Sequence, residues 1–319
     1  MTIRVGETVE LKHPRRDVKC CAIAKGQTLL ATGGQDGNVY LWESAEGVLL
    51  MTLEGGHTGD VNSVSFNSDG SMLASAGEDG RLVFWDLEKM SEKVRHRFLE
   101  GHGEGVALTV CQFAPNSALL VSGGKDSDVM LWGNLGRPVC GRLRGHRNWV
   151  TCAAFSNDSL YLATGGFDHA VCLWNCTNFS IVQTLRRHAA AVTAVSLSVE
   201  GSVIASGDSD GTVLLSRSDG TVLRELLGHR DIVSGIAMVE TFDLILSSSH
   251  DWSVKVWSLR GQCVKSLKQH EGRVLSITVN TDQDLLCTTG DDFLAKVTPF
   301  VFDEAVALTT DDIDFVPDT

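Results

Sequence analysis

One short phrase recurs seven times along this chain of 319 residues. Each copy has a Ser or Thr, an Asp four residues later, and then an alternating apolar run. The seven Asp residues, 41 to 47 positions apart, are Asp36, Asp79, Asp126, Asp168, Asp210, Asp251 and Asp292. A fixed period of about 20–50 residues is the signature of a repeat architecture in which each copy is one supersecondary unit. The chain is therefore predicted to be built from seven similar units.

Three other positions keep a constant spacing from each Asp. The hydroxyl residues are Thr32, Ser75, Ser122, Thr164, Ser206, Ser247 and Thr288. A histidine stands 18 to 20 residues before each hydroxyl, at His13, His57, His102, His146, His188, His229 and His270. A tryptophan follows the Asp by six residues in five copies, at Trp42, Trp85, Trp132, Trp174 and Trp257. Ser216 and Thr298 take that place in copies five and seven.

Four of the histidines follow glycine, as Gly56-His57, Gly101-His102, Gly145-His146 and Gly228-His229, and one tryptophan precedes aspartate, as Trp85-Asp86. With the repeat period, these positions resemble the WD-repeat family over roughly residues 3–302. The resemblance implies an all-β fold, a single seven-bladed β-propeller of four-stranded antiparallel blades.

The resemblance also implies a role for the constant residues. The Asp would accept a hydrogen bond from the His, the His would meet the hydroxyl, and the Trp N–H would donate into the same network. Structural tetrads are thus expected at His57, Ser75, Asp79 and Trp85, and at His146, Thr164, Asp168 and Trp174. Because buried indole and carboxylate groups need partners, the blades of copies five and seven, which lack the Trp, are expected to be looser.

The intervals between the phrases favour strands. Residues 61–66 alternate with period two, and residues 82–85 and 171–174 are β-branched or aromatic runs bounded by turns. Five prolines are few, as a sheet protein requires. The segment before each His would be the outer strand of the preceding blade, so residues 3–11 are predicted to complete blade seven.

The expected domains are a propeller over residues 1–302 and an acidic C-terminal tail over residues 303–319. A short extra strand at residues 305–308 is the alternative for part of that tail.

Charge and composition narrow the range of partners. The net charge is −13, and no basic run of the kind that binds phosphate backbones is visible, so nucleic acid and anionic membranes are not expected partners. No apolar stretch approaches a membrane helix, and the N-terminus lacks a signal-peptide pattern. The nine cysteines fit buried thiols of a reducing compartment. The expectation is an intracellular protein, cytoplasmic first, with a nuclear or cytoskeletal assembly as alternatives.

Ser/Thr, His and Asp together could suggest a hydrolytic triad. An enzyme needs one activated nucleophile in a cleft with an oxyanion hole, whereas this chain has the same trio seven times. No phosphate-binding loop or zinc motif is present, and Cys172 and Cys176 have no second ligand pair. The prediction is therefore no enzyme, no cofactor, no metal and a monomeric propeller.

A partner is expected on the face that bears the turns before the seven Asp residues, hereafter the Asp face. Candidate residues there are aromatic or apolar in blades four and six, at Trp149, Phe167, Ile232, His250 and Trp252. Blades seven, one and two offer an acidic arc at Asp291, Asp17, Asp60 and Glu78. Aromatic clusters are where binding energy concentrates, and the arc would suit Arg or Lys in a peptide. The alternatives are aromatic rings that pack on their neighbours and solvated carboxylates.

Residues 86–101 are longer than the equivalent connections and are expected to project from the opposite face, as a solvated loop or a second contact site. The leading functional hypothesis is a non-catalytic scaffold or adaptor within a multiprotein complex. The alternative is a substrate receptor of a cullin-type ubiquitin ligase, which often has Arg or Lys two residues after the Trp-Asp pair. Glu88 stands there in this chain, and Arg260 follows a Trp-Ser pair instead. A propeller enzyme is the remote alternative.

Overall fold

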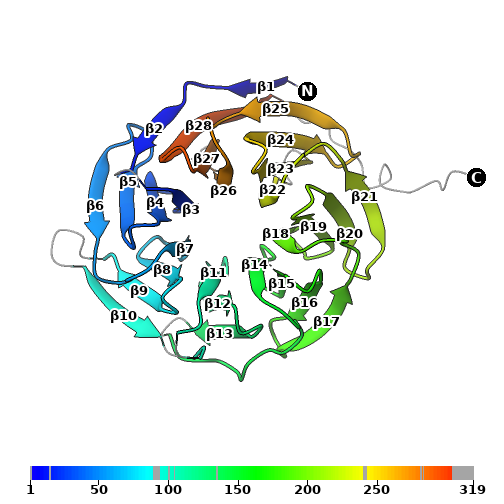
Figure 1. Ribbon diagram of the computed structural model, residues 1–319, viewed down its shortest axis with the longest axis horizontal. Helices are drawn as coiled ribbons and strands as arrows, with labels where there is room; N and C mark the ends of the chain where they lie inside the picture. The colour runs from blue at the N-terminus through cyan, green and yellow to red at the C-terminus, as the bar shows by residue number, and fades with distance from the viewer. Residues whose placement is uncertain are drawn as a thin grey trace, which may run out of the picture.

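Seven β-sheets stand in a ring around an open centre (Figure 1). The computed structural model describes residues 2–13, 16–88, 94–99, 101–103, 105–133, 136–239, 243–280, 282 and 284–303. Every helix or strand within those ranges is a β-strand. The predicted all-β, seven-bladed propeller is confirmed.

Each blade begins at the centre and proceeds outward, strand by strand, in antiparallel pairs. The inner strands are β3 (Val18–Ile23), β7 (Val61–Phe66), β11 (Leu108–Phe113), β14 (Val150–Phe155), β18 (Val192–Leu197), β22 (Val233–Val239) and β26 (Val274–Asn280). The second strands are β4 (Leu29–Gly34), β8 (Met72–Gly77), β12 (Leu119–Gly124), β15 (Tyr161–Gly166), β19 (Val203–Asp208), β23 (Leu244–Ser249) and β27 (Leu285–Gly290). These second strands are almost wholly buried, because neighbouring blades cover both of their faces.

The third strands are β5 (Val39–Glu43), β9 (Leu82–Asp86), β13 (Val129–Gly133), β16 (Val171–Asn175), β20 (Val213–Arg217), β24 (Ser253–Ser258) and β28 (Leu294–Asp303). The outer strands are β6 (Leu49–Leu53), β10 (Arg95–Leu99), β17 (Ser180–Leu185), β21 (Val222–Leu226) and β25 (Cys263–Lys268), with β1 (Thr2–Val5) and β2 (Val9–Lys12) in blade seven. In blade three the outer position is held by two single bridges, Val129 to Leu143 and Trp132 to Pro138.

The N-terminal segment closes the ring, as predicted. β2 pairs with β28 from Val9↔Val297 to Lys12↔Leu294, and β1 pairs with the far half of β28. Leu11 is packed among residues of blades seven and one, including Val18 and Cys287. Because β1 and β2 cover the outer edge of β28, strands from the start and the end of the described chain share one sheet, and the ring is held together without a covalent link.

A β-bulge follows the first residue of every inner strand. In blade four, for example, Val150 pairs with Gly166 and Cys152 with Gly165, so Thr151 is left over. A bulge re-aims its extra side chain. The seven extra residues stand at the Asp-face mouth of the central channel and are Lys19, Asn62, Thr109, Thr151, Thr193, Ser234 and Leu275.

Two expectations lie partly or wholly outside the described residues. Within residues 86–101, β10 pairs with β9, whereas residues 89–93 and 100 are not described. β28 continues to Asp303, which pairs with Thr2. Residues 304–319, with the alternative strand at 305–308, lie outside the described residues.

Closure by β2 predicts a specific weak point. Leu11→Ala removes a side chain that is 1% exposed and is expected to lower the free energy of unfolding by about 2–5 kcal/mol. The matched control is Lys12→Ala on the exposed side of the same strand. Urea denaturation measures both variants. Equal, small losses for the two variants would contradict closure by this strand.

Candidate partner-binding face

The constant residues form a buried hydrogen-bonded network in each blade. In blade two, His57 Nε2 lies 2.7 Å from Ser75 Oγ, and Trp85 Nε1 donates to the same oxygen at 2.9 Å. His57 Nδ1 lies 3.1 Å from Asp79. Blade four repeats the arrangement with His146, Thr164, Asp168 and Trp174. Blades three and six have the same three contacts.

The glycine before the histidine is explained by the tryptophan ring. A Cβ on Gly56 would lie 2.3 Å from Cζ2 of Trp85, and one on Gly145 would lie 2.7 Å from Cη2 of Trp174. Blades five and seven have Arg187 and Gln269 in place of the glycine, and both lack the Trp. Loss of the ring removes the steric need for glycine in these two blades. Blade one differs, because it has Lys12 in place of the glycine and keeps Trp42.

Blade five corrects one predicted residue. The phrase contains two aspartates, and His188 Nδ1 contacts Asp208 at 2.8 Å, not Asp210. Asp208 is 2% exposed, whereas Asp210 is exposed and contributes its backbone N–H to the Asp208 carboxylate. Counting four residues from the hydroxyl selects the wrong carboxylate here, because the buried Asp208 replaces the second small residue of the phrase.

Blade one also departs from the common pattern. His13 Nε2 and Trp42 Nε1 both contact Thr32 Oγ1, at 2.8 and 2.7 Å. Asp36, however, accepts from the hydroxyl of Tyr40 at 2.6 Å. Burial lowers the pKa of His13 to about 4, although Asp36 partly opposes this, so the ring is neutral at physiological pH.

These trios are built for stability. Ser75, Thr164 and Ser247 have no exposed surface, so no substrate can approach their hydroxyl groups. Each hydroxyl already accepts from an indole N–H. A nucleophile needs access and a free lone pair directed at the substrate.

The carboxylates of these networks are stabilised in their ionised form. Burial by itself would raise the pKa of Asp168, but hydrogen bonds from His146 and the backbone of Arg147 outweigh burial and lower it to about 2. The pKa of Asp79 is lowered to about 2 in the same way, against the effect of burial, by His57 and the backbone of Thr58.

The corrected assignment in blade five is open to direct test. Asp208→Asn is expected to lower the free energy of unfolding by about 1.5–3 kcal/mol, because a charge-assisted hydrogen bond to His188 is lost. Asp210→Asn, the matched control two residues away, should change it by no more than about 0.5 kcal/mol. Thermal and urea unfolding compare the two, and the reverse order would restore Asp210 as the network residue.

Acid should weaken the same contacts. Because the folded pKa of Asp168 is about 2 and its ordinary value is 3.8, its contribution is complete above pH 3.8 and disappears as the pH falls toward 2. Asp168→Asn is therefore expected to cost about 1.5–3 kcal/mol at pH 7 and much less at pH 2. Urea titrations at both pH values measure this, and an equal cost at both would refute it.

The Asp face has a hollow at the mouth of the central channel. It measures about 450 Å³ and is lined by Asp17, Lys19, Gln35, Asn62, Glu78, Thr109, Arg273 and Leu275. Four of these eight residues, Lys19, Asn62, Thr109 and Leu275, are bulge residues.

Several of the bulge residues join neighbouring blades. This role was not predicted from the sequence. Each donates to the backbone carbonyl of the first residue of the next inner strand: Asn62 to Leu108, Thr109 to Val150, Thr151 to Val192, and Thr193 to Val233. A threonine at the same position of three successive repeats was the sequence pattern that could have indicated it. Thr109, Thr151 and Thr193 therefore link blades, and their hydroxyl hydrogens are already used.

Trp149 and Phe167 do come together on this face. Their ring centroids are 5.2 Å apart, and the backbone N–H of Phe167 donates to the carbonyl of Trp149 at 2.9 Å. Trp149 is 39% and Phe167 44% exposed. Lys125 Nζ lies 4.8 Å from the centroid of the Trp149 ring, within cation–π range.

The predicted acidic arc is neutralised in part by basic residues. Lys19 Nζ contacts Asp60 at 2.6 Å, Lys125 Nζ contacts Glu78 at 2.5 Å, and Arg273 Nε contacts Asp291 at 2.7 Å. Asp17 accepts from the Gln35 amide at 3.0 Å. The arc is therefore a mixed-charge surface, and Lys125 connects it to Trp149.

The blade-six candidates form a separate group. His250 donates its backbone N–H to the carbonyl of Ile232 at 2.9 Å, and burial together with Arg273 lowers the pKa of the His250 ring. Trp252 is 45% exposed and adopts a left-handed backbone with φ of 73°. Lys268 Nζ lies 5.5 Å from its ring centroid. No ring contact joins Trp252 to Trp149 among the described residues.

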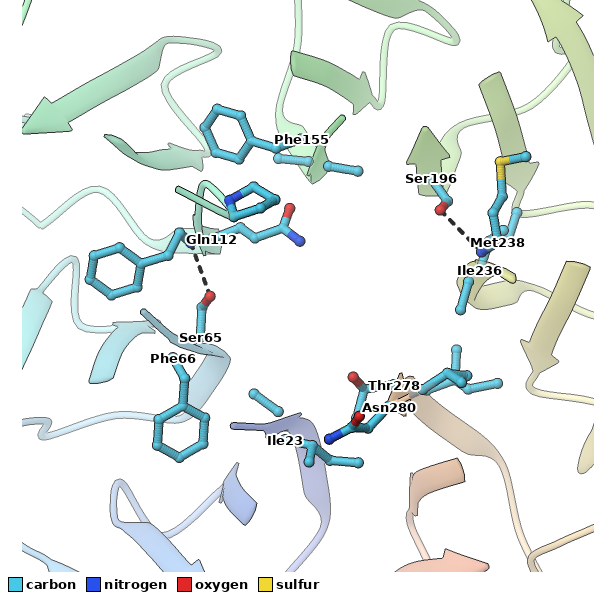
Figure 2. A pocket seen from close by; sticks show the side chains of 18 of the residues that line it. Ile23, Ser65, Phe66, Gln112, Phe155, Ser196, Ile236, Met238, Thr278 and Asn280 are labelled. Carbon is cyan, nitrogen blue, oxygen red and sulfur yellow. Dashed lines mark hydrogen bonds between the residues drawn. The ribbon is translucent and has the colours of Figure 1, made fainter. Parts of the chain in front are cut away.

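A larger hollow of about 630 Å³ occupies the opposite end of the channel. Its walls are the later halves of the inner strands, and Figure 2 shows Ile23, Gln112, Ile236, Met238 and Asn280 around an open centre. The blades are joined here by bonds such as Ser196 Oγ with the Met238 backbone N–H, at 3.3 Å. The lining is mainly uncharged and belongs to the channel wall.

The ring of seven blades and the buried His–hydroxyl–Trp networks define a WD-repeat propeller, a class of protein-interaction folds. Residues 17–292 match the family described as the IFT122 first beta-propeller, and the chain belongs to that family.

Curated relatives match over shorter stretches. WD repeat and SOCS box-containing protein 1 of Homo sapiens is 33% identical over 127 residues, which cover 37% of this chain and 29% of that protein. Meiotic fizzy-related protein 1 of Schizosaccharomyces pombe is 34% identical over 115 residues, 36% of this chain and 25% of that protein. Nuclear distribution protein nudF 1 of Talaromyces marneffei is 28% identical over 149 residues, which cover 46% of this chain and 31% of that protein. The matches thus span about a quarter to a third of each relative.

Two further observations concern the described part of the chain. No group of three or more His, Cys, Asp or Glu residues in it is placed to hold a metal ion. No helix in it has the length and apolar character needed to cross a membrane.

Proposed function

We propose that this propeller is a non-catalytic scaffold or adaptor that holds a partner protein on its Asp face. The observation that carries the proposal is the exposed aromatic pair, Trp149 and Phe167, whose rings lie 5.2 Å apart. Exposed apolar patches of this kind mark interaction sites, and aromatic residues supply most of the binding energy in interfaces.

The aromatic pair is ordered in the absence of a partner. Trp149 immediately precedes β14, the inner strand of blade four, and Phe167 lies in the turn directly before Asp168. A backbone hydrogen bond joins the two residues, their rings contact each other, and Lys125 lies over the ring of Trp149. A surface that is ordered in advance loses less conformational entropy on binding.

Other observations fit the same proposal. The His–Asp–hydroxyl trios of blades two to seven and the His13–Thr32 contact of blade one are part of the structural frame, which leaves them no role in catalysis. A net charge of −13 favours a protein partner over nucleic acid. All nine cysteines are free thiols, which supports an intracellular, first of all cytoplasmic, location.

The alternative of a ubiquitin-ligase substrate receptor uses the same face. One similar protein has a SOCS box in its name, but the match covers 29% of that protein. In this chain Glu88 occupies the place after Trp85-Asp86 where Arg or Lys is often found in such receptors. A cullin among the captured proteins would favour this alternative.

The docking face is tested by affinity capture and mass spectrometry. The double variant Trp149→Ala/Phe167→Ala is expected to lose one set of partners at least about tenfold, since each aromatic anchor contributes roughly 1–2 kcal/mol or more. Folding is checked first by thermal unfolding.

The matched control is Val48→Ala/Leu50→Ala, which removes two similarly exposed apolar side chains from the outer surface of blade one. If the captured set survives the aromatic variant but is lost in the control, docking takes place on the outer surface and the proposal is wrong. An unchanged set in both variants would direct attention to residues 86–101.

A further inference from the structure

The acidic arc at the Asp-face hollow has one more carboxylate than the neighbouring cations can pair. Lys19, Lys125 and Arg273 are each within 2.7 Å of a carboxylate oxygen, of Asp60, Glu78 and Asp291 respectively. Asp17 is the fourth carboxylate. Among the described residues no cation lies within ion-pair distance of it, and its side chain accepts one hydrogen bond, from Gln35 to Oδ2. Oδ1 is left for another donor.

The surroundings of Asp17 favour a cation. Burial, and after it the negative charge of Asp291, raises the pKa of Asp17. Arg273 and Lys19 act in the opposite direction but are paired with other carboxylates. A positive group brought into the hollow would relieve this strain on the ionised carboxylate.

The shape of the hollow also fits a basic side chain. Leu275 and the carboxyl group of Asp17 both line it, so an aliphatic stem can pack on an apolar wall while its charged head meets an acceptor. Gln35 donates to Asp17 through Nε2. The oxygen of the same Gln35 amide is a second acceptor for an incoming basic group.

Lys125 connects the hollow with the aromatic pair. Lys125 contacts Glu78, which lines the hollow, and also lies over the ring of Trp149. On the far side of the pair, blade five has small side chains at the corresponding positions, Ala191, Thr193 and Ser209. A peptide therefore has room to cross the rim beside Trp149 and Phe167 and reach the channel mouth.

We infer that the hollow takes a lysine or arginine side chain of the partner, held by Asp17, while an apolar residue nearby in the partner packs on Trp149 and Phe167. This inference rests on the proposed function and adds the chemistry of the partner: a peptide segment with one basic residue close to an apolar or aromatic one. A neutral or acidic segment would leave Asp17 without a counter-charge.

The test begins with a phage-displayed library of random dodecapeptides selected on the immobilised full chain. Enriched peptides are expected to contain Lys or Arg near Trp, Phe or Leu. The binding of one such peptide, and of its copy with Gln for the basic residue, is then measured by fluorescence anisotropy. Asp17→Asn should weaken the binding of the basic peptide by about tenfold or more, because a charge-assisted hydrogen bond is lost. The affinity of the Gln copy should not change.

The control variant is Glu200→Gln, which removes the same charge from an exposed hairpin of blade five at the opposite end of the propeller. Equal affinity of the basic peptide for Asp17→Asn and Glu200→Gln would overturn the inference. So would enrichment of acidic or neutral peptides, or a library without binders. Two of these outcomes leave peptides that bind: equal affinity for the two charge variants, and enrichment of acidic or neutral peptides. If Trp149→Ala still weakens the binding of those peptides, the aromatic docking face stands and only the role of Asp17 is wrong. If Trp149→Ala also has no effect, both proposals fail.

Discussion

Each blade depends on one buried hydroxyl group, at most 3% of whose residue is exposed. Ser75 Oγ is within 2.9 Å of both His57 Nε2 and Trp85 Nε1, and these groups come from three different parts of the blade. An unsatisfied indole or imidazole in this position would cost about 1–3 kcal/mol. The hydroxyl therefore fixes the loop before the inner strand against the second and third strands. The Asp face is made of the loops and turns placed in this way, so the site depends on the frame beneath it.

The repeat made the fold predictable. Seven Asp positions with constant His, hydroxyl and Trp offsets predicted seven blades, and the position of His13 near the start predicted closure by the N-terminal strand, which β2 confirms. Blade five shows the limit of counting. Only the contact of His188 with the buried Asp208 shows which of two neighbouring aspartates belongs to the network.

The candidate site was less predictable than the frame. The expectation that Trp149 and Phe167 lie on one face follows from their repeat positions, and the structure places them in contact. The sequence did not show that Thr151 and Thr193 donate to the carbonyls of the next blade, nor that three cations pair with three of the four acidic residues. All of these contacts except Arg273 with Asp291 join residues about 40 or more positions apart, and their geometry depends on how tightly adjacent blades pack. Local patterns do not carry that information.

The central claim is that a partner occupies the Asp face at Trp149 and Phe167. Hydroxyl-radical footprinting of the propeller with and without its captured partner tests this most directly, because it measures the accessibility of individual side chains in the native complex. Docking at this face predicts strong protection of Trp149 and Phe167 and unchanged reactivity at Val48 and Leu50 on the outer surface of blade one. Protection of Val48 and Leu50 with full reactivity of the two aromatic residues would contradict it.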